Sequence, residues 1–265
     1  MKLYTVTITG ADDQTNPEDL VALTEKYPFV EWGILLSAKR EGSERYPTVE
    51  WIEGLRSHRN QLRLSGHLCG RWVRELKQGH LTFRTERPTI WGMFRRIQLN
   101  MGGKYEVELN NFLDAVSLLH DKQIILQVNS MQNELLAQAL KARVNTVPLF
   151  DLSGGRGESP GSWPEPANCE RCGYAGGLGP ENLEEQLKSI SEAVGDREIW
   201  VDMESNVRTE NVLDLNKVER CLQIAEEYVI PESRAATYLE IPSSQRKVHD
   251  SFPPPPTNGS SKRNS

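Results

Sequence analysis

The sequence predicts a (β/α)8 barrel, a ring of eight parallel strands surrounded by helices, followed by a disordered C-terminal tail. From residue 1 to about 230, short β-branched or apolar runs alternate with longer amphipathic stretches. Eight strands and about seven helices in this length fit a closed barrel somewhat better than an open doubly wound sheet. No GxGxxG follows the first strand and no Walker motif occurs, which disfavours a dinucleotide- or nucleotide-binding sheet.

The strand predictions rest on runs rich in β-branched and apolar residues, as expected for strands buried on both faces. These runs cover residues 3–9, 31–37, 62–67, 95–99, 122–128, 146–150, 173–175 and 198–203. Amphipathic patterns predict helices at residues 16–26, 105–119, 130–142, 180–194 and 216–228. The first of these has Asn16 as a candidate N-cap and Pro17 at its first position.

Composition excludes several protein classes. The chain has 31 Lys and Arg against 37 Asp and Glu, a net charge of −6, which disfavours a nucleic-acid-binding core. The longest apolar runs are far shorter than the roughly 20 residues of a membrane span. The start, MKLYTVTITG, lacks the apolar region of a signal peptide, so we expect a cytoplasmic protein with reduced cysteines.

The four cysteines predict no metal site. Cys169 and Cys172 form a CxxC, but no second CxxC or HxxxH supplies the two further ligands of a structural zinc. We therefore expect no metal and no cofactor.

The C-terminal residues have a different composition from the rest. The sequence predicts two parts, a barrel at residues 1–230 and an extension at residues 231–265. From about residue 243 the extension reads SSQRKVHDSFPPPPTNGSSKRNS, which is too poor in apolar residues to fold. A polyproline segment can bind an aromatic groove, but an unstructured terminus is the simpler interpretation.

Glycine-rich loops follow the predicted sixth and seventh strands. One contains Gly155, and the other contains Gly176 and Gly177 shortly before a helix. Glycine lets the backbone approach a ligand, and a helix N-terminus favours an anion. Because (β/α)8 barrels place their active sites at this end, the loops indicate a phosphate site.

Three segments resemble phosphoribosylanthranilate isomerases. VPLFDLSGGRGESPGSW, YAGGLGPENLEEQL and WVDMESNVRTENVLDLNKVERCLQIAE are similar to the last third of that family. GSERYPTVEWI, RIQLNMGG and TVTITG resemble its KSxRYVS, QLHG and KICG stretches more loosely, so the likeness spans roughly residues 3 to 229.

The resemblance implies specific roles. Asp151 matches the general acid that protonates the furanose ring oxygen, and Arg45 matches an active-site arginine suited to an anionic group. A further set of matched positions would bind the sugar phosphate: Gly155, Gly176, Gly177, Ser205, Asn206 and Arg208.

The departures from the family pattern affect the base and the phosphate site. Thr9 stands where the family has its catalytic cysteine, and a threonine hydroxyl alone is too weak a base. His67 is a candidate replacement because its ordinary pKa is near 6.5. Asp202 and Glu204, which share one face of the last strand, are further candidates. Asn206 replaces a glycine, and Arg208 replaces a glutamate in a way that adds a cation.

The resemblance implies an aldose–ketose isomerase, an intramolecular oxidoreductase that carries out an Amadori rearrangement of an amino sugar phosphate, as in tryptophan biosynthesis. Its partner would be a small sugar phosphate, with no nucleic acid and no membrane. Two alternatives stay open: a barrel enzyme of other chemistry, such as a hydrolase or lyase, and a non-catalytic phosphate-ligand-binding barrel. The sequence predicts no particular oligomeric state.

Overall fold

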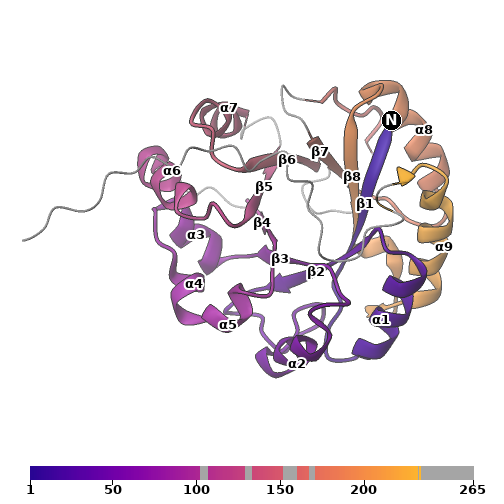
Figure 1. The fold of residues 1–265 in the computed structure, drawn as a ribbon, viewed down its shortest axis with the longest axis horizontal. Helices are drawn as coiled ribbons and strands as arrows, with labels where there is room; N and C mark the ends of the chain where they lie inside the picture. The colour runs from indigo at the N-terminus through magenta and orange to yellow at the C-terminus, as the bar shows by residue number, and fades with distance from the viewer. Residues whose placement is uncertain (102–106, 129–132, 152–159, 167–170, 232, 234–265) are drawn as a thin grey trace, which may run out of the picture.

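A computed structural model gives the fold of the chain and describes residues 1–101, 107–128, 133–151, 160–166, 171–231 and 233. Eight parallel strands close into a barrel in which each strand pairs with the next along the chain and β8 returns to β1 (Figure 1). The strands are β1 Lys2–Thr9, β2 Val30–Leu36, β3 Leu64–Leu68, β4 Arg96–Leu99, β5 Gln123–Val128, β6 Thr146–Asp151, β7 Arg171–Ala175 and β8 Glu198–Met203. The predicted (β/α)8 barrel is confirmed.

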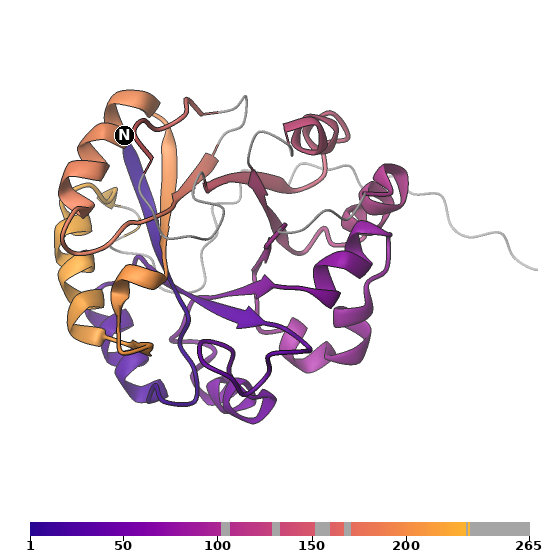
Figure 2. The ribbon, with the colours of Figure 1, turned by 180° about the vertical axis from the view of Figure 1, so that it is seen from behind.

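Helices surround the barrel, as both ribbon views show (Figures 1 and 2). The α-helices are α1 Pro17–Lys26, α2 Val49–Gly54, α3 Arg71–Lys77, α4 Thr82–Glu86, α5 Pro88–Trp91, α6 Leu109–Ser117, α7 Asn133–Lys141, α8 Leu183–Val194 and α9 Leu215–Glu226. Short 3-10 helices lie at η1 Leu55–His58 and η2 Ser205–Val207, and a small hairpin pairs β9 Arg208–Thr209 with β10 Val212–Leu213. Asn16 caps α1 by accepting a hydrogen bond from the Glu18 amide, as its position predicts.

The barrel interior is partly polar. Arg96 Nη1 lies 2.8 Å from Glu31 Oε1, and Thr7 donates a hydrogen bond to the same oxygen. The Arg96 guanidinium also lies over the ring of Trp200, with its central carbon 4.3 Å from the ring centroid. The two ionised groups are buried as a pair, which limits the cost of removing them from water.

The chain after α9 returns to the first strand. Val229 forms a parallel bridge with Leu3, and the amide of Ile230 donates a hydrogen bond to the carbonyl of Leu3. This pairing lies at the amino end of β1, opposite the end at which active sites of such barrels lie. The predicted extension, residues 231–265, lies almost wholly outside the described residues.

Candidate active site

The carboxyl ends of β1 and β8 bring Thr9 and Asp202 into contact. The Thr9 hydroxyl donates a 2.7 Å hydrogen bond to Asp202 Oδ1 across 193 residues of sequence. Both residues are buried, and alternation along β8 puts Asp202 on the same face as Trp200, inside the barrel. Thr9 therefore holds the carboxyl group of Asp202 through its hydroxyl.

The environment of Asp202 favours its protonated form. Burial raises the pKa of the Asp202 carboxyl to about 7, while the hydrogen bond from Thr9 lowers it. The negative charges of Glu204, Asp151 and Glu31 also raise the pKa. A carboxyl with a pKa near 7 can exchange a proton at neutral pH.

Asp151 ends β6 and points into the same part of the barrel. Gln127 Nε2 on β5 donates a 2.6 Å hydrogen bond to Asp151 Oδ2, and Gln127 Oε1 accepts one from the amide of Met101. In the strand register Asp151 is level with Ala175, and Ala175 is level with Asp202. The short side chain of Ala175 therefore lies between two carboxyl-bearing strands.

His67 on β3 lies inside the barrel and is fully buried. Its Nε2 is 3.0 Å from the hydroxyl of Ser65, and burial together with the charge of Arg96 lowers its pKa to about 3. The imidazole is therefore neutral at physiological pH and is a weak proton acceptor.

Gly33 on β2 makes room between Thr9 and His67. A Cβ atom at this position would lie 2.3 Å from Thr9 Oγ1 and 2.8 Å from His67 Nε2. Thr9 and Gly33 are also level in the strand register. Only glycine fits between these side chains without displacing one of them.

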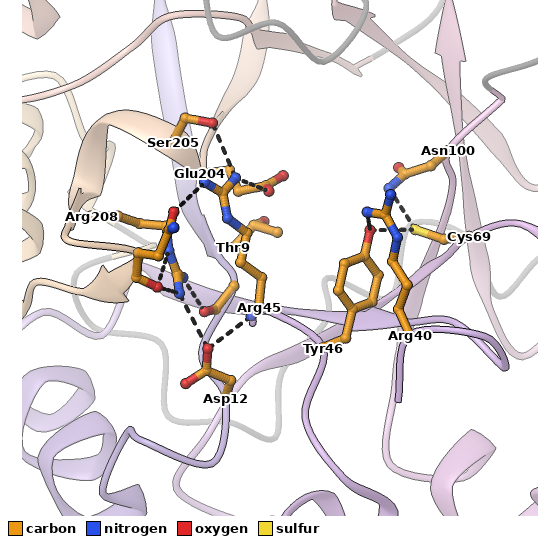
Figure 3. Close-up of polar contacts among 12 residues, drawn as sticks. Thr9, Asp12, Arg40, Arg45, Tyr46, Cys69, Asn100, Glu204, Ser205 and Arg208 are labelled. Carbon is orange, nitrogen blue, oxygen red and sulfur yellow. Dashed lines mark hydrogen bonds and ion pairs between the residues drawn. The ribbon is translucent and has the colours of Figure 1, made fainter. Parts of the chain in front are cut away.

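Arg45 follows β2 and reaches past the end of β1 to Glu204 and Ser205, which follow β8 (Figure 3). Its Nη1 atom is 2.9 Å from Glu204 Oε1 and 3.3 Å from Ser205 Oγ. Its backbone has a φ of 70°, and its amide donates a hydrogen bond to Asp12 Oδ2. Arg45 thus lies at the mouth, already paired with a carboxylate of the chain.

Arg208 lies beneath this group and is enclosed. Its guanidinium contacts Asp12 at 3.2 Å and donates hydrogen bonds to the carbonyls of Gly10 and Asn211 (Figure 3). The side chains of Arg208 and Asp12 are only 2% and 4% exposed. We therefore assign Arg208 a structural role, because an anion in solution cannot reach this guanidinium without rearrangement.

Two of the segments predicted to bind phosphate, at Gly176–Gly177 and at Asn206, meet after β7 and β8. Gly176 and Gly177 have φ values of 115° and 66°, which favour glycine. Asn206 Nδ2 donates a 2.7 Å hydrogen bond to the carbonyl of Gly177, and Asn182 donates another to the same oxygen. The side chain of Asn206 thus joins the two loops, close to the N-terminus of α8.

A second polar cluster lies across the mouth at the ends of β3 and β4 (Figure 3). Asn100 donates a 3.1 Å hydrogen bond to the sulfur of Cys69, and the Tyr46 hydroxyl is 4.0 Å from that sulfur. Burial raises the pKa of the Cys69 thiol to about 11, so it is protonated at neutral pH. The cluster can offer polar contacts to a ligand, but its protonated thiol is a poor nucleophile.

Sequence reasoning missed two residues of the site. Gln127 supports Asp151, and Asp12 connects Arg45 to Arg208. Gln127 could have been identified from the sequence, because it lies one residue before the end of a predicted strand, where active-site residues of such barrels lie. Gly155 of the predicted set lies outside the described residues.

Two features are absent from the described part of the chain. No group of three or more His, Cys, Asp or Glu side chains there is arranged to hold a metal ion. Within the same residues, no helix has the length and apolar character to cross a membrane.

The family comparison matches the part of the chain that carries Asp151 and Asp202. A family model described as N-(5'phosphoribosyl)anthranilate (PRA) isomerase matches residues 106–224, somewhat less than half of the chain. This part of the chain is similar to the PRA isomerase family. The matched region also contains the Gly176–Gly177 turn and Asn206, but ends before Val229 and does not include Thr9 or Arg45.

Solved structures of PRA isomerases share the fold. The N-(5'-phosphoribosyl)anthranilate isomerase from Pyrococcus furiosus is 16% identical, with a TM-score of 0.51 over 84% of this chain and 98% of that one. The phosphoribosyl anthranilate isomerase from Thermotoga maritima is also 16% identical, with a TM-score of 0.52 over 86% of this chain and 100% of that one. No curated protein sequence matches the chain.

Proposed function

We propose that the protein isomerises an amino sugar phosphate by an Amadori rearrangement, with phosphoribosylanthranilate as the first substrate to test. The observation that carries the proposal is Asp151 at the carboxyl end of β6, held by Gln127 and facing the barrel interior. The PRA isomerase family model covers this residue. Asp151 is the proposed general acid, which protonates the ring oxygen of the sugar so that the ring opens.

The proposed substrate site combines the loops after β7 and β8 with Arg45. The turn at Gly176 and Gly177, with Ser205 and Asn206, lies beside the N-terminus of α8, where backbone amides and the helix dipole favour a phosphate. Arg45 lies at the same mouth and suits an anionic group on the substrate. A small sugar phosphate is therefore the proposed partner.

The test is the loss of anthranilate-type fluorescence when the purified protein meets phosphoribosylanthranilate. Replacing a general acid costs about 10²- to 10⁴-fold in rate, so Asp151→Asn should lose at least a hundredfold in kcat. Asp114→Asn is the matched control, because Asp114 is exposed on α6, away from the mouth. An unchanged rate in Asp151→Asn would remove the acid assignment.

The phosphate site has its own test. Inorganic phosphate or sulfate should raise the Tm, since a ligand that binds only the folded state stabilises it. Asn206→Asp places a negative charge beside the Gly177 turn and should abolish this rise in Tm. Asn60→Asp, at an exposed position after η1, is the control and should keep the rise. No shift of the parent protein at tens of millimolar phosphate would count against the site. Binding of a substrate analogue without turnover would favour the alternatives of other chemistry or a binding protein.

A further inference from the structure

The hydrogen bond between Thr9 and Asp202 leaves one carboxylate oxygen available. Thr9 occupies Oδ1, and no described residue donates a hydrogen bond to Oδ2. Thr9 is 1% exposed and Asp202 is 8% exposed, so both side chains are buried and Asp202 is the less enclosed residue of the two. Thr9 is thus placed to orient Asp202, and Asp202 is placed to meet a ligand.

Asp202 and Asp151 lie on alternate strands at the same level of the barrel. The residue between them in the register is Ala175, which places only a methyl group between the two carboxyl-bearing positions. Two carboxyl groups that approach a ligand from β6 and β8 supply an acid and a base at separate points of one molecule. The amino sugar of the proposed function needs both.

We infer that Asp202 is the general base of this reaction and that Thr9 is the positioning residue that holds its carboxylate. The inference rests on the proposed function. Asp151 gives a proton to the ring oxygen, the bond from that oxygen to C1 breaks, and C1 becomes part of an iminium. Asp202 Oδ2 then takes the proton from C2. The C2–H electron pair becomes the C1=C2 double bond, and the C1=N pair returns to nitrogen to give an enolamine. Asp202 then returns its proton to C1 while the C2 hydroxyl proton passes to Asp151, which gives the ketose and restores both carboxyl groups to their starting states. Substrate and product are isomers, so no further reactant is required.

The charged groups around Asp202 set its pH response. Glu204 lies just after β8, Asp151 ends β6 and Glu31 lies on β2, and the charge of each raises the pKa of Asp202. Glu204 is paired with Arg45 and Glu31 with Arg96, so two of these three carboxylates carry a neutralising partner. Burial, together with the negative charges of these three groups, raises the pKa of Asp202 to about 7, near the pH at which a base works best.

Three variants test the assignment through pH profiles with phosphoribosylanthranilate. Asp202→Asn should lower kcat at least a hundredfold while the affinity for a reduced open-chain analogue stays within threefold. Thr9→Val removes the donor that lowers the Asp202 pKa, so the acidic limb of kcat/KM should move to higher pH. Thr9→Ser keeps the hydroxyl and should restore the parent profile. The assignment would be overturned if the kcat of Asp202→Asn stayed within threefold of the parent value. It would also be overturned if the acidic limb of kcat/KM stayed at the same pH in Thr9→Val.

A second measurement separates this inference from the proposed function. The carboxyl carbon of Asp202 can be followed by NMR as pH changes, with Asp202→Asn assigning the signal. The midpoint should lie near 7 and should rise in Thr9→Val, whether or not the chosen substrate is turned over. If the parent protein does not turn over the substrate, the proposed function fails on its own. If the midpoint does not respond to Thr9, the pairing of Thr9 with Asp202 fails.

Discussion

The guanidinium of Arg45 lies 2.9 Å from the carboxylate of Glu204, so the mouth arginine is neutralised by a side chain of its own barrel. Both side chains are partly exposed, at 27% and 37%. An anionic substrate group that uses Arg45 must therefore displace Glu204 or share the guanidinium with it. Pairs of this exposure are worth no more than about 1 kcal/mol, so the exchange is accessible.

Glu204→Gln should tighten the binding of the reduced open-chain analogue by about two- to fivefold, because the internal competitor for Arg45 loses its charge. The same change removes a negative charge that raises the pKa of Asp202, so the acidic limb of the rate profile should move to lower pH. Calorimetry and the pH profile measure the two effects. Glu53→Gln, an equal charge change on the exposed surface of α2, is the control. Weaker binding in Glu204→Gln would contradict the competition between Glu204 and substrate.

Gly33→Ala should destabilise the barrel by about 1–3 kcal/mol, the usual cost of overpacking a core. The new methyl group would overlap the Thr9 hydroxyl and the His67 ring. It should also lower activity, because Thr9 must move away from Asp202. Gly54→Ala is the matched control, since a Cβ there meets no atom within 4 Å. Urea denaturation checks the difference, and equal midpoints for the two variants would contradict the close packing at Gly33.

Arg208→Met should destabilise the fold by about 3–5 kcal/mol, because it leaves the Asp12 carboxylate buried without its ion-pair partner. Arg220→Met removes an exposed pair with Glu181 and should cost at most about 1 kcal/mol. Comparing the two variants by chemical denaturation tests the structural role of Arg208. A stability loss equal to that of Arg220→Met would show that the enclosed guanidinium contributes little.

Asp202→Asn should make the protein more stable than the parent above neutral pH. The folded pKa of about 7 lies above the ordinary value of 3.8, so ionisation of Asp202 opposes folding. Its stabilising contribution is complete below about pH 4 and is lost as pH rises through 7. The Tm of the variant should therefore exceed that of the parent by several degrees at pH 8, and this advantage should shrink at pH 5. A difference that does not change between these two pH values would contradict the raised pKa.

The strand positions could be predicted because a barrel strand is buried on both faces and is therefore apolar along its length. The eight predicted runs agree with the observed strands to within two residues at either end. The short helices between β3 and β4 were not predicted. Each spans four to seven residues, interrupted by glycine, threonine or proline, which is too short for a helical periodicity to show.

The candidate site was only partly readable from the sequence. Strand ends and the family likeness placed Asp151 and Thr9 at the mouth, and alternation made Asp202 a candidate base. Which side chains touch could not be predicted, because the Thr9–Asp202 and Arg45–Glu204 contacts join residues 193 and 159 positions apart. The burial that lowers the pKa of His67 is likewise a property of the closed barrel.

The pairing of Ile230 with Leu3 has a consequence for engineering the protein. It puts the start of β1 and the segment after α9 side by side, on the end of the barrel away from Asp151 and Asp202. A reporter domain fused after this segment would leave the substrate entrance open. The same proximity suits a circular permutant, in which a short linker replaces residues 231–265 and joins the segment after α9 to β1, and new termini are opened in a helix–strand loop at the base.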